Sequence, residues 1–103
     1  MITIEALRRL NNAKRYAITE HARIRLSERG ITLDDIIKCV ADGEIIEQYQ
    51  NDKPLPSCLV LGAELSGKYI HAVVSHDDEF IYLITAYYPD NRQWNSDFKT
   101  RRK

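Results

Sequence analysis

The sequence has little of the chemistry that holds small secreted proteins together or carries a chain across a membrane. Only two of its 103 residues are cysteines, Cys39 and Cys58, and both lie among apolar residues. We therefore expect two reduced, half-buried thiols in a chain that is long enough to fold without a disulfide or metal. No charged-then-apolar leader opens the chain, and no apolar run approaches the roughly 18 residues that span a bilayer. A cytoplasmic protein without membrane contact is expected.

Metal and cofactor chemistry has equally little support. The four glycines form no phosphate-binding loop. No cysteine–histidine pair has zinc-finger spacing, and of His71 and His76, which are five positions apart, the second falls in an expected turn. Burial in a strand would raise the pKa of the Cys58 thiol, which makes it a weak nucleophile. We expect no metal and no cofactor.

An excess of charge of one sign is also lacking, since 15 basic residues balance 15 acidic ones. The distribution is uneven. Residues 1–30 hold seven basic and three acidic side chains, and the last 23 residues hold five basic and two acidic ones. Residues 31–52, between them, hold one basic and six acidic side chains. If the two ends meet in space, they form a local basic patch that the zero net charge hides. The alternative is a solvated surface of mixed sign.

What the chain does have is a helical region followed by a strand-like region. The helical spacing of Ile4, Leu7 and Leu10 predicts a first helix at Ile2–Lys14. Capping residues and stop glycines mark two more, at Thr19–Arg29 and Thr32–Gly43. Four strands follow, at Glu44–Tyr49, Ser57–Glu64, Lys68–Ser75 and Phe80–Tyr87. Because every connection is short, neighbouring strands should pair antiparallel. The expected fold is one α+β domain, residues 1–103, with N-terminal helices packed on a four-stranded antiparallel meander sheet.

The last two expected strands carry large apolar or aromatic side chains on both faces. In the third, Ile70, Ala72 and Val74 should point away from Tyr69, His71 and Val73. Strict alternation in the fourth would set Phe80, Tyr82, Ile84 and Ala86 opposite Ile81, Leu83, Thr85 and Tyr87. One face of each strand must meet the helices, and the other carries aromatic and polar residues that a purely structural surface does not need.

Beyond Pro89, the stretch from Trp94 to Lys103 is expected to form a short helix or an ordered extension. Trp94 and Phe98, four positions apart, would fold one face of this tail onto the domain. Its basic end, which includes Arg101, is either a solvated terminus or a phosphate contact near the end of the fourth strand.

The second helix holds the first candidate site residues. His21, Arg25 and Arg29 are each four positions apart and fall between apolar positions, so we expect them to point toward the body of the protein. Inward charge is costly unless it is paired or lines a wet cleft. The alternative is that the arginines pair with nearby carboxylates and that His21 is a structural brace.

His71, in the middle of a strand, is the second candidate, with Thr85, Tyr69 and Tyr87 as neighbours if the register allows. These residue types suit RNA cleavage without a metal. Histidine transfers protons near neutral pH, and a guanidinium stabilises the charge that grows on the phosphate. A threonine or tyrosine hydroxyl can hold the phosphate, and exposed tyrosines can stack on unpaired bases. The alternative is a buried histidine with a structural role.

An ordered set of motifs resembles a family of small bacterial proteins classed as a domain of unknown function. The resemblance covers about residues 15–102. The motifs are His21-Ala-Arg-Ile-Arg25, Arg29-Gly-Ile31, Asp35-Ile36, Gly43-Glu-Ile-Ile46, Tyr49, Asp52, Pro54, Pro56-Ser57, the His71 strand, Thr85-Ala-Tyr-Tyr-Pro-Asp90, Trp94 and Arg101.

That family is similar to the barnase, EndoU, colicin and RelE-like group of ribonuclease toxins. The resemblance implies that His21, Arg25, His71 and Thr85 are the catalytic positions. The residues themselves make Arg29, Tyr69, Tyr87 and Arg101 the candidates for substrate binding. It also implies an antitoxin partner with a zinc-binding domain. The near-neutral net charge departs from the basic balance of ribosome-dependent toxins and argues against ribosome binding more than against RNA cleavage.

Three functions are therefore compared. The first is a metal-independent endoribonuclease, the toxin of a toxin–antitoxin pair, which predicts that His21 and His71 share one cleft. The second is a non-catalytic protein-interaction module, with the histidines apart and an apolar tyrosine patch. The third is an RNA-binding accessory protein without turnover. RNA, the antitoxin and a second copy of the chain are the candidate partners.

Overall fold

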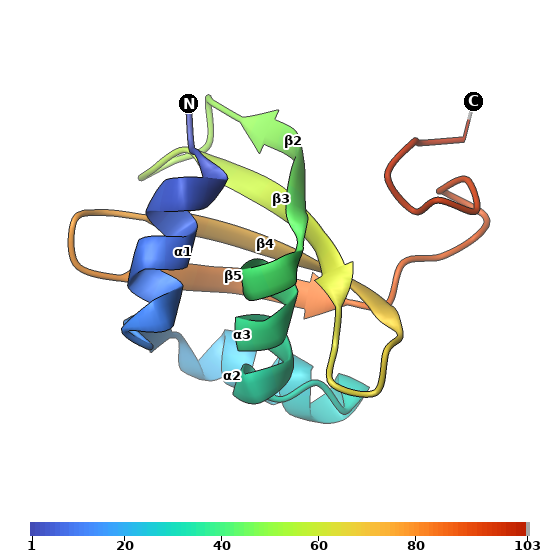
Figure 1. Ribbon diagram of the computed structural model, residues 1–103, viewed down its shortest axis with the longest axis horizontal. Coiled ribbons are helices and arrows are strands. Elements are labelled where there is room, and N and C mark those ends of the chain that lie inside the picture. Colours follow the sequence, from blue (N-terminus) through green and yellow to red (C-terminus); the bar gives the residue numbers. More distant parts are fainter. Residues whose placement is uncertain (103) are drawn as a thin grey trace.

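The computed structural model describes residues 1–102 and combines three helices with a five-stranded mixed sheet (Figure 1). Helices α1 and α3 cover one face of the sheet, and α2 runs beside β5. None of the described helices is both long and apolar enough to cross a bilayer. The elements are α1 (Ile4–Asn12), β1 (Tyr16–Ile18), α2 (Glu20–Arg29), α3 (Leu33–Asp42), β2 (Glu44–Tyr49), β3 (Ser57–Ala63), β4 (Tyr69–His76) and β5 (Ile81–Tyr87).

The ends of α2 and α3 lie where local sequence signals place them. The Thr19 hydroxyl accepts from the Ala22 N–H, and Gly30 ends α2 in the left-handed conformation with φ of 69°. At α3, Thr32 and Asp35 form a reciprocal capping box. A capping side chain contributes about 1 kcal/mol by pairing an amide that has no partner within the helix. These two helix predictions are confirmed.

Helix α1 is shorter than predicted at both ends. The Thr3 hydroxyl accepts from the Ala6 N–H and begins the helix at Ile4. The helix ends at Asn12, and Lys14 just beyond it has φ of 55°, which no helix continues.

The sheet has the order β1-β5-β4-β3-β2, and its last four strands form the predicted antiparallel meander. The prediction of a four-stranded, wholly antiparallel sheet was nevertheless wrong, because β1 adds a fifth strand that pairs parallel with β5. Tyr16 lies opposite Ile81, and Ile18 lies opposite Leu83. Three residues between two helices are too few to show a strand period, so only the tertiary structure reveals this strand.

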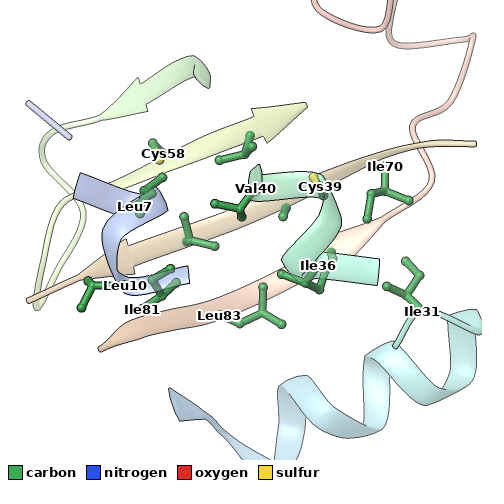
Figure 2. Close-up of a cluster of buried hydrophobic side chains, with 14 of the residues drawn as sticks. Leu7, Leu10, Ile31, Ile36, Cys39, Val40, Cys58, Ile70, Ile81 and Leu83 are labelled. Carbon is green, nitrogen blue, oxygen red and sulfur yellow. The ribbon is translucent and has the colours of Figure 1, made fainter. Parts of the chain in front are cut away.

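The core lies between the sheet and helices α1 and α3 (Figure 2). Leu7 and Leu10 of α1 and Ile36 and Val40 of α3 point toward the strands. Gly62 of β3 allows the close approach of α3, since a Cβ there would lie 2.4 Å from a helix carbonyl oxygen. Tight packing of this kind fixes the position of the helix on the sheet.

Both cysteines belong to this core and are fully buried rather than half-buried as expected. Burial raises the pKa of the Cys39 and Cys58 thiols to about 12. Neither thiol is in the ionised form that acts as a nucleophile near neutral pH.

The opposite side of the sheet, which we call the outer face, carries His71, Val73 and Ser75 of β4, as the alternation of β4 predicts. In β5 the predicted alternation fails, because the β4–β5 register shifts and leaves Ile84 as an extra residue. A bulge of this kind moves every later side chain to the other face. Ile81, Leu83 and Ala86 therefore enter the core, whereas Tyr82, Thr85 and Tyr87 lie on the outer face.

Residues 88–102, the C-terminal segment, leave the end of β5 (Figure 1). Phe98 and Arg101 of this segment contact His71 and Glu47 on the outer face. The segment consists of turns with one isolated bridge between Trp94 and Arg101, so the expected ordered extension is present and the expected helix is not. Trp94 is 2% exposed, and Phe98, although partly exposed, lies against Tyr69. Lys103, expected at the basic end, lies outside the described residues.

Candidate functional site

The eight predicted site residues fall into two groups around the outer face. His21, Arg25 and Arg29 come from α2, which lies along β5. The other five come from β4, β5 and the C-terminal segment. Their exposure and contacts differ sharply.

The prediction that His21 and Arg25 point inward was wrong, since both are exposed. The buried residues of α2 are Ala22 at 1% and Leu26 at 5% exposure, and Ile24, expected inside, is 47% exposed. Helix α2 lies at the β5 side of the sheet, so only a narrow strip of it meets the core. Its charged side chains therefore need no buried partner.

Arg29 attaches the last turn of α2 to β5. Its Nη1 donates to the Thr85 hydroxyl at 3.0 Å and to the Ala86 carbonyl oxygen at 2.8 Å. The alternative of carboxylate partners does not hold, because within residues 1–102 neither Arg25 nor Arg29 forms an ion pair. Arg25 has no side-chain hydrogen bond in that range either, so its guanidinium is available to an anion.

A hollow of about 970 Å³ opens beside the N-terminal end of α2. His21 lines it, while Arg29 reaches Thr85 two turns further along the helix. Residues four positions apart lie on the same side of a helix, so Arg25, which is exposed and does not line the hollow, lies between these two along α2. We call this space the α2 hollow; its lining is Ala17, Ile18, Thr19, His21, Asp52, Lys53, Pro54, Leu55, Ser75, Tyr82, Leu83 and Ile84.

The polar groups of the α2 hollow differ in how far they are engaged. Asp52 accepts from the Ser57 hydroxyl at 2.5 Å. The Tyr82 hydroxyl donates to Asp77, and that hydrogen bond raises the pKa of Tyr82. Ser75 is 6% exposed and forms no side-chain hydrogen bond within residues 1–102, and Lys53 is exposed. A ligand in the hollow could therefore contact an imidazole, an ammonium and a hydroxyl.

His71 lies outside the α2 hollow and is fully buried under the C-terminal segment. Its Nε2 is 2.7 Å from the Phe98 carbonyl oxygen, and its Nδ1 is 3.3 Å from the Tyr87 hydroxyl. Since a carbonyl only accepts, Nε2 carries the proton and Nδ1 accepts from Tyr87. The rings of Trp94 and His71 pack edge-to-face, with their centroids 4.5 Å apart.

The electrostatics around His71 favour a neutral brace. Burial lowers the pKa of His71 below its ordinary value. Next to it, the Arg101 guanidinium donates to Glu47 at 2.9 and 3.1 Å and holds the pKa of that carboxyl below its usual range. Burial, together with the hydrogen bond it donates to Glu47, raises the pKa of Tyr49 to about 12. All the groups beside the imidazole are hydrogen-bonded, which is typical of a structural histidine.

The basic C-terminal end contacts the acidic middle of the chain rather than the basic N-terminal region. Lys99 pairs with Glu44 at 3.0 Å, and Arg101 pairs with Glu47 while its guanidinium covers the Trp94 ring at 4.5 Å. The described residues of the two ends therefore do not merge into the basic patch that the charge distribution suggested. Within the described residues Arg101 is engaged by Glu47, and its role as a phosphate contact stays a prediction.

The structure does not bring the two candidate histidines into one cleft. His71 and Ser75 are four residues apart on β4, about 13 Å at the usual rise of a strand, and only Ser75 reaches the hollow that His21 lines. Tyr69 is 52% exposed beside Phe98. The expectation of a shared cleft was wrong, because Nε2 of His71 is hydrogen-bonded to the C-terminal segment. The sequence did not reveal the path of that segment.

Sequence reasoning missed two residues of the hollow. Lys53 lies in the proline-containing loop after β2, and that loop was predicted without a role. No sequence signal distinguished Ser75. Its place opposite Tyr82 depends on how β4 pairs with β5, which the sequence does not specify. Within residues 1–102, no group of three or more histidine, cysteine or acidic side chains is arranged to hold a metal ion.

No curated protein and no solved structure matches the chain. A family model described as a domain of unknown function, DUF4258, matches residues 18–88, which is more than half of the sequence. The match runs from the last residue of β1 to just beyond β5, so it contains both histidine candidates and excludes α1 and most of the C-terminal segment. The resemblance to a domain of unknown function is thereby confirmed, whereas no finding links it to ribonuclease toxins. The chain belongs to the DUF4258 family.

Proposed function

We propose that the chain is a metal-independent endoribonuclease, the toxin of a toxin–antitoxin pair, whose active site is the α2 hollow with Arg25 beside it and which uses His21 alone in place of the two histidines that the sequence suggested. One observation supports this most directly. An accessible imidazole, His21, lines a hollow of about 970 Å³, and Arg25, whose guanidinium has no partner within residues 1–102, lies one helical turn further along α2. A proton-transfer group next to a phosphate-binding group is what cleavage of an RNA backbone requires.

The reaction we propose uses the ribose 2′-hydroxyl as nucleophile. His21 takes the 2′-hydroxyl proton while the 2′-oxygen forms a bond to phosphorus. The bond from phosphorus to the 5′-oxygen breaks, and that oxygen takes a proton from the Lys53 ammonium. The products are a 2′,3′-cyclic phosphate and a 5′-hydroxyl. Arg25 donates hydrogen bonds to the two non-bridging oxygens, whose charge grows in the transition state.

Cleavage of a fluorogenic single-stranded RNA in the presence of EDTA tests this proposal. His21→Gln should lower kcat/KM by about 10²- to 10⁴-fold, and Arg25→Gln by about 10²- to 10³-fold. Both side chains are exposed, so both variants should fold like the wild type. Arg23→Gln is the matched control, because Arg23 is an exposed arginine on the opposite side of α2, paired with Glu20. Equal rates for the wild type and the His21 and Arg25 variants would refute the site.

The same variants connect the proposal to the predicted antitoxin. Induced expression of the wild type should slow bacterial growth, and His21→Gln should relieve the effect. A protein that inhibits the nuclease would have to cover the α2 hollow, so its binding should protect the amide of Ser75 from hydrogen exchange. Growth inhibition that persists in the His21 variant would contradict a nuclease toxin acting through this residue.

A second candidate function is RNA binding without turnover. It is favoured by the burial of His71, because only one candidate imidazole, that of His21, then lines the hollow. A cleavage mechanism with two histidines would need both of them there. It predicts that RNA binds and is weakened by Arg25→Gln, but that no cleavage product forms. Product analysis on a sequencing gel separates the two functions.

A further inference from the structure

Ser75 is a residue of low exposure whose hydroxyl forms no side-chain hydrogen bond within residues 1–102, and that hydroxyl is reachable from the α2 hollow, because the buried polar atom without a partner in these residues is Arg8 Nε. Ser75 lies on the outer face of β4, directly opposite Tyr82 of β5, and only 6% of it is exposed. A hydroxyl on a side chain held in place by a strand is a fixed donor and acceptor. A ligand whose polar edge enters the hollow could form a hydrogen bond with it.

The walls around Ser75 suit a flat ligand with apolar faces. Ile18, Pro54, Leu55 and Ile84 line the hollow together with the Tyr82 ring. Binding sites for small ligands are typically apolar, with a few polar groups that fix orientation. Exposed apolar surface alone would fit many molecules, but here the Ser75 hydroxyl adds a point for one hydrogen bond.

The edge of the same hollow suits an anion attached to that flat group. Lys53 lines the edge from the loop after β2, His21 lines it from α2, and Arg25 lies one turn beyond. A flat apolar body with a polar edge and an attached phosphate is the chemistry of a nucleotide.

We propose that the α2 hollow is a nucleobase pocket, in which one unpaired nucleotide stacks its base on Tyr82 and bonds its edge to Ser75. This inference rests on the proposed function, which supplies RNA as the substrate. A hydroxyl can donate or accept, and stacking tolerates every base. The pocket therefore selects single-stranded nucleotides as a class, with little preference among the four bases.

Binding of free nucleotides to the full chain tests the pocket without any cleavage step. Adenosine and uridine 5′-monophosphate are titrated against labelled protein while the amide signals of Ser75 and Tyr82 are followed by NMR. Ribose 5-phosphate, which lacks the base, should bind at least tenfold more weakly than either nucleotide. A uridine hexamer should bind more tightly than uridine 5′-monophosphate if RNA rather than a free nucleotide is the ligand.

Two matched pairs of variants separate the contacts. Tyr82→Leu should weaken nucleotide binding by about 5- to 100-fold through loss of stacking, whereas Tyr82→Phe keeps the ring and should stay within about twofold. Ser75→Ala should weaken binding by about two- to tenfold, the loss of one net hydrogen bond. Ser27→Ala, an exposed serine of α2 outside the hollow, should have no effect.

The outcomes distinguish this pocket from the nuclease. Ribose 5-phosphate binding as tightly as the nucleotides, or unchanged binding in both Ser75→Ala and Tyr82→Leu, would overturn the nucleobase pocket even if RNA is cleaved. Nucleotide binding with the expected variant effects but without RNA cleavage would support the pocket and remove the nuclease.

Discussion

The docking of the C-terminal segment can be tested at Trp94. The indole is 2% exposed, with the His71 ring 4.5 Å from its centroid and the Arg101 guanidinium 4.5 Å from it as well. A buried tryptophan covers about 150–250 Å², which at about 25 cal/mol per Å² is worth roughly 4–6 kcal/mol. That value is an upper bound, because the unfolded chain already buries part of this area.

Trp94→Ala should therefore lower the free energy of unfolding by about 3–5 kcal/mol, the usual cost of truncating a buried tryptophan. For a chain of this size each kcal/mol lowers Tm by roughly 4–8 °C, so a decrease of at least about 12 °C is expected. Urea unfolding followed by circular dichroism gives the free energy, and Trp94→Phe, which keeps an aromatic ring, should lose less than half as much.

The wild type offers an independent check, because Trp94 is the only tryptophan in the sequence. Its fluorescence should be shielded from acrylamide in the native state and become accessible on unfolding. A loss below about 1 kcal/mol in Trp94→Ala, together with acrylamide access in the native wild type, would show that the segment does not dock on the outer face in solution.

Three further measurements test the core and the brace. Gly62→Ala would place a Cβ 2.4 Å from the Cys39 carbonyl oxygen, so thermal denaturation should show a loss of at least about 1–3 kcal/mol; an unchanged Tm would contradict the close approach of α3. Tyr16→Phe removes the donor at 2.6 Å from the Asn11 amide oxygen, and urea unfolding should show a loss of about 1–3 kcal/mol. Because burial lowers the pKa of His71, its contribution to stability is complete above its ordinary pKa of 6.5 and is lost as the pH falls through the lower native value. Between pH 7 and pH 5 the free energy of unfolding should therefore fall more in the wild type than in His71→Gln.

The helices and the meander could be predicted because their signals are local. Thr19 and Thr32 pair amides within three residues, and Gly30 supplies the left-handed residue that ends α2. Short connections then force β2 to β5 to pair with their neighbours in sequence. None of these features needs information from a distant part of the chain.

The candidate site was predicted in composition but not in arrangement. His21, Arg25 and Arg29 do lie along one side of α2, as their spacing requires. Their exposure depends on where α2 sits against the sheet, and the burial of His71 depends on the path of the C-terminal segment. A helical wheel contains neither piece of information, which is why the inward direction of α2 was assigned wrongly.

The β5 bulge shows the same limit within a single strand. Periodicity assigns alternate residues to opposite faces, but the extra residue at Ile84 exchanges the faces of everything after Leu83. It places Thr85 and Tyr87 on the same face as Tyr82. The bulge follows from pairing with β4, so it is absent from the pattern of β5 alone.

Capping, turn chemistry and hydrophobic period act over a few residues, so the order of helices and strands follows from the amino acids in this chain. Which groups meet across the sheet is a matter of long-range pairing, because β1 pairs with β5, and residues 88–102 contact the outer face, across long separations in the sequence. That packing encloses one imidazole and leaves the other beside an open hollow.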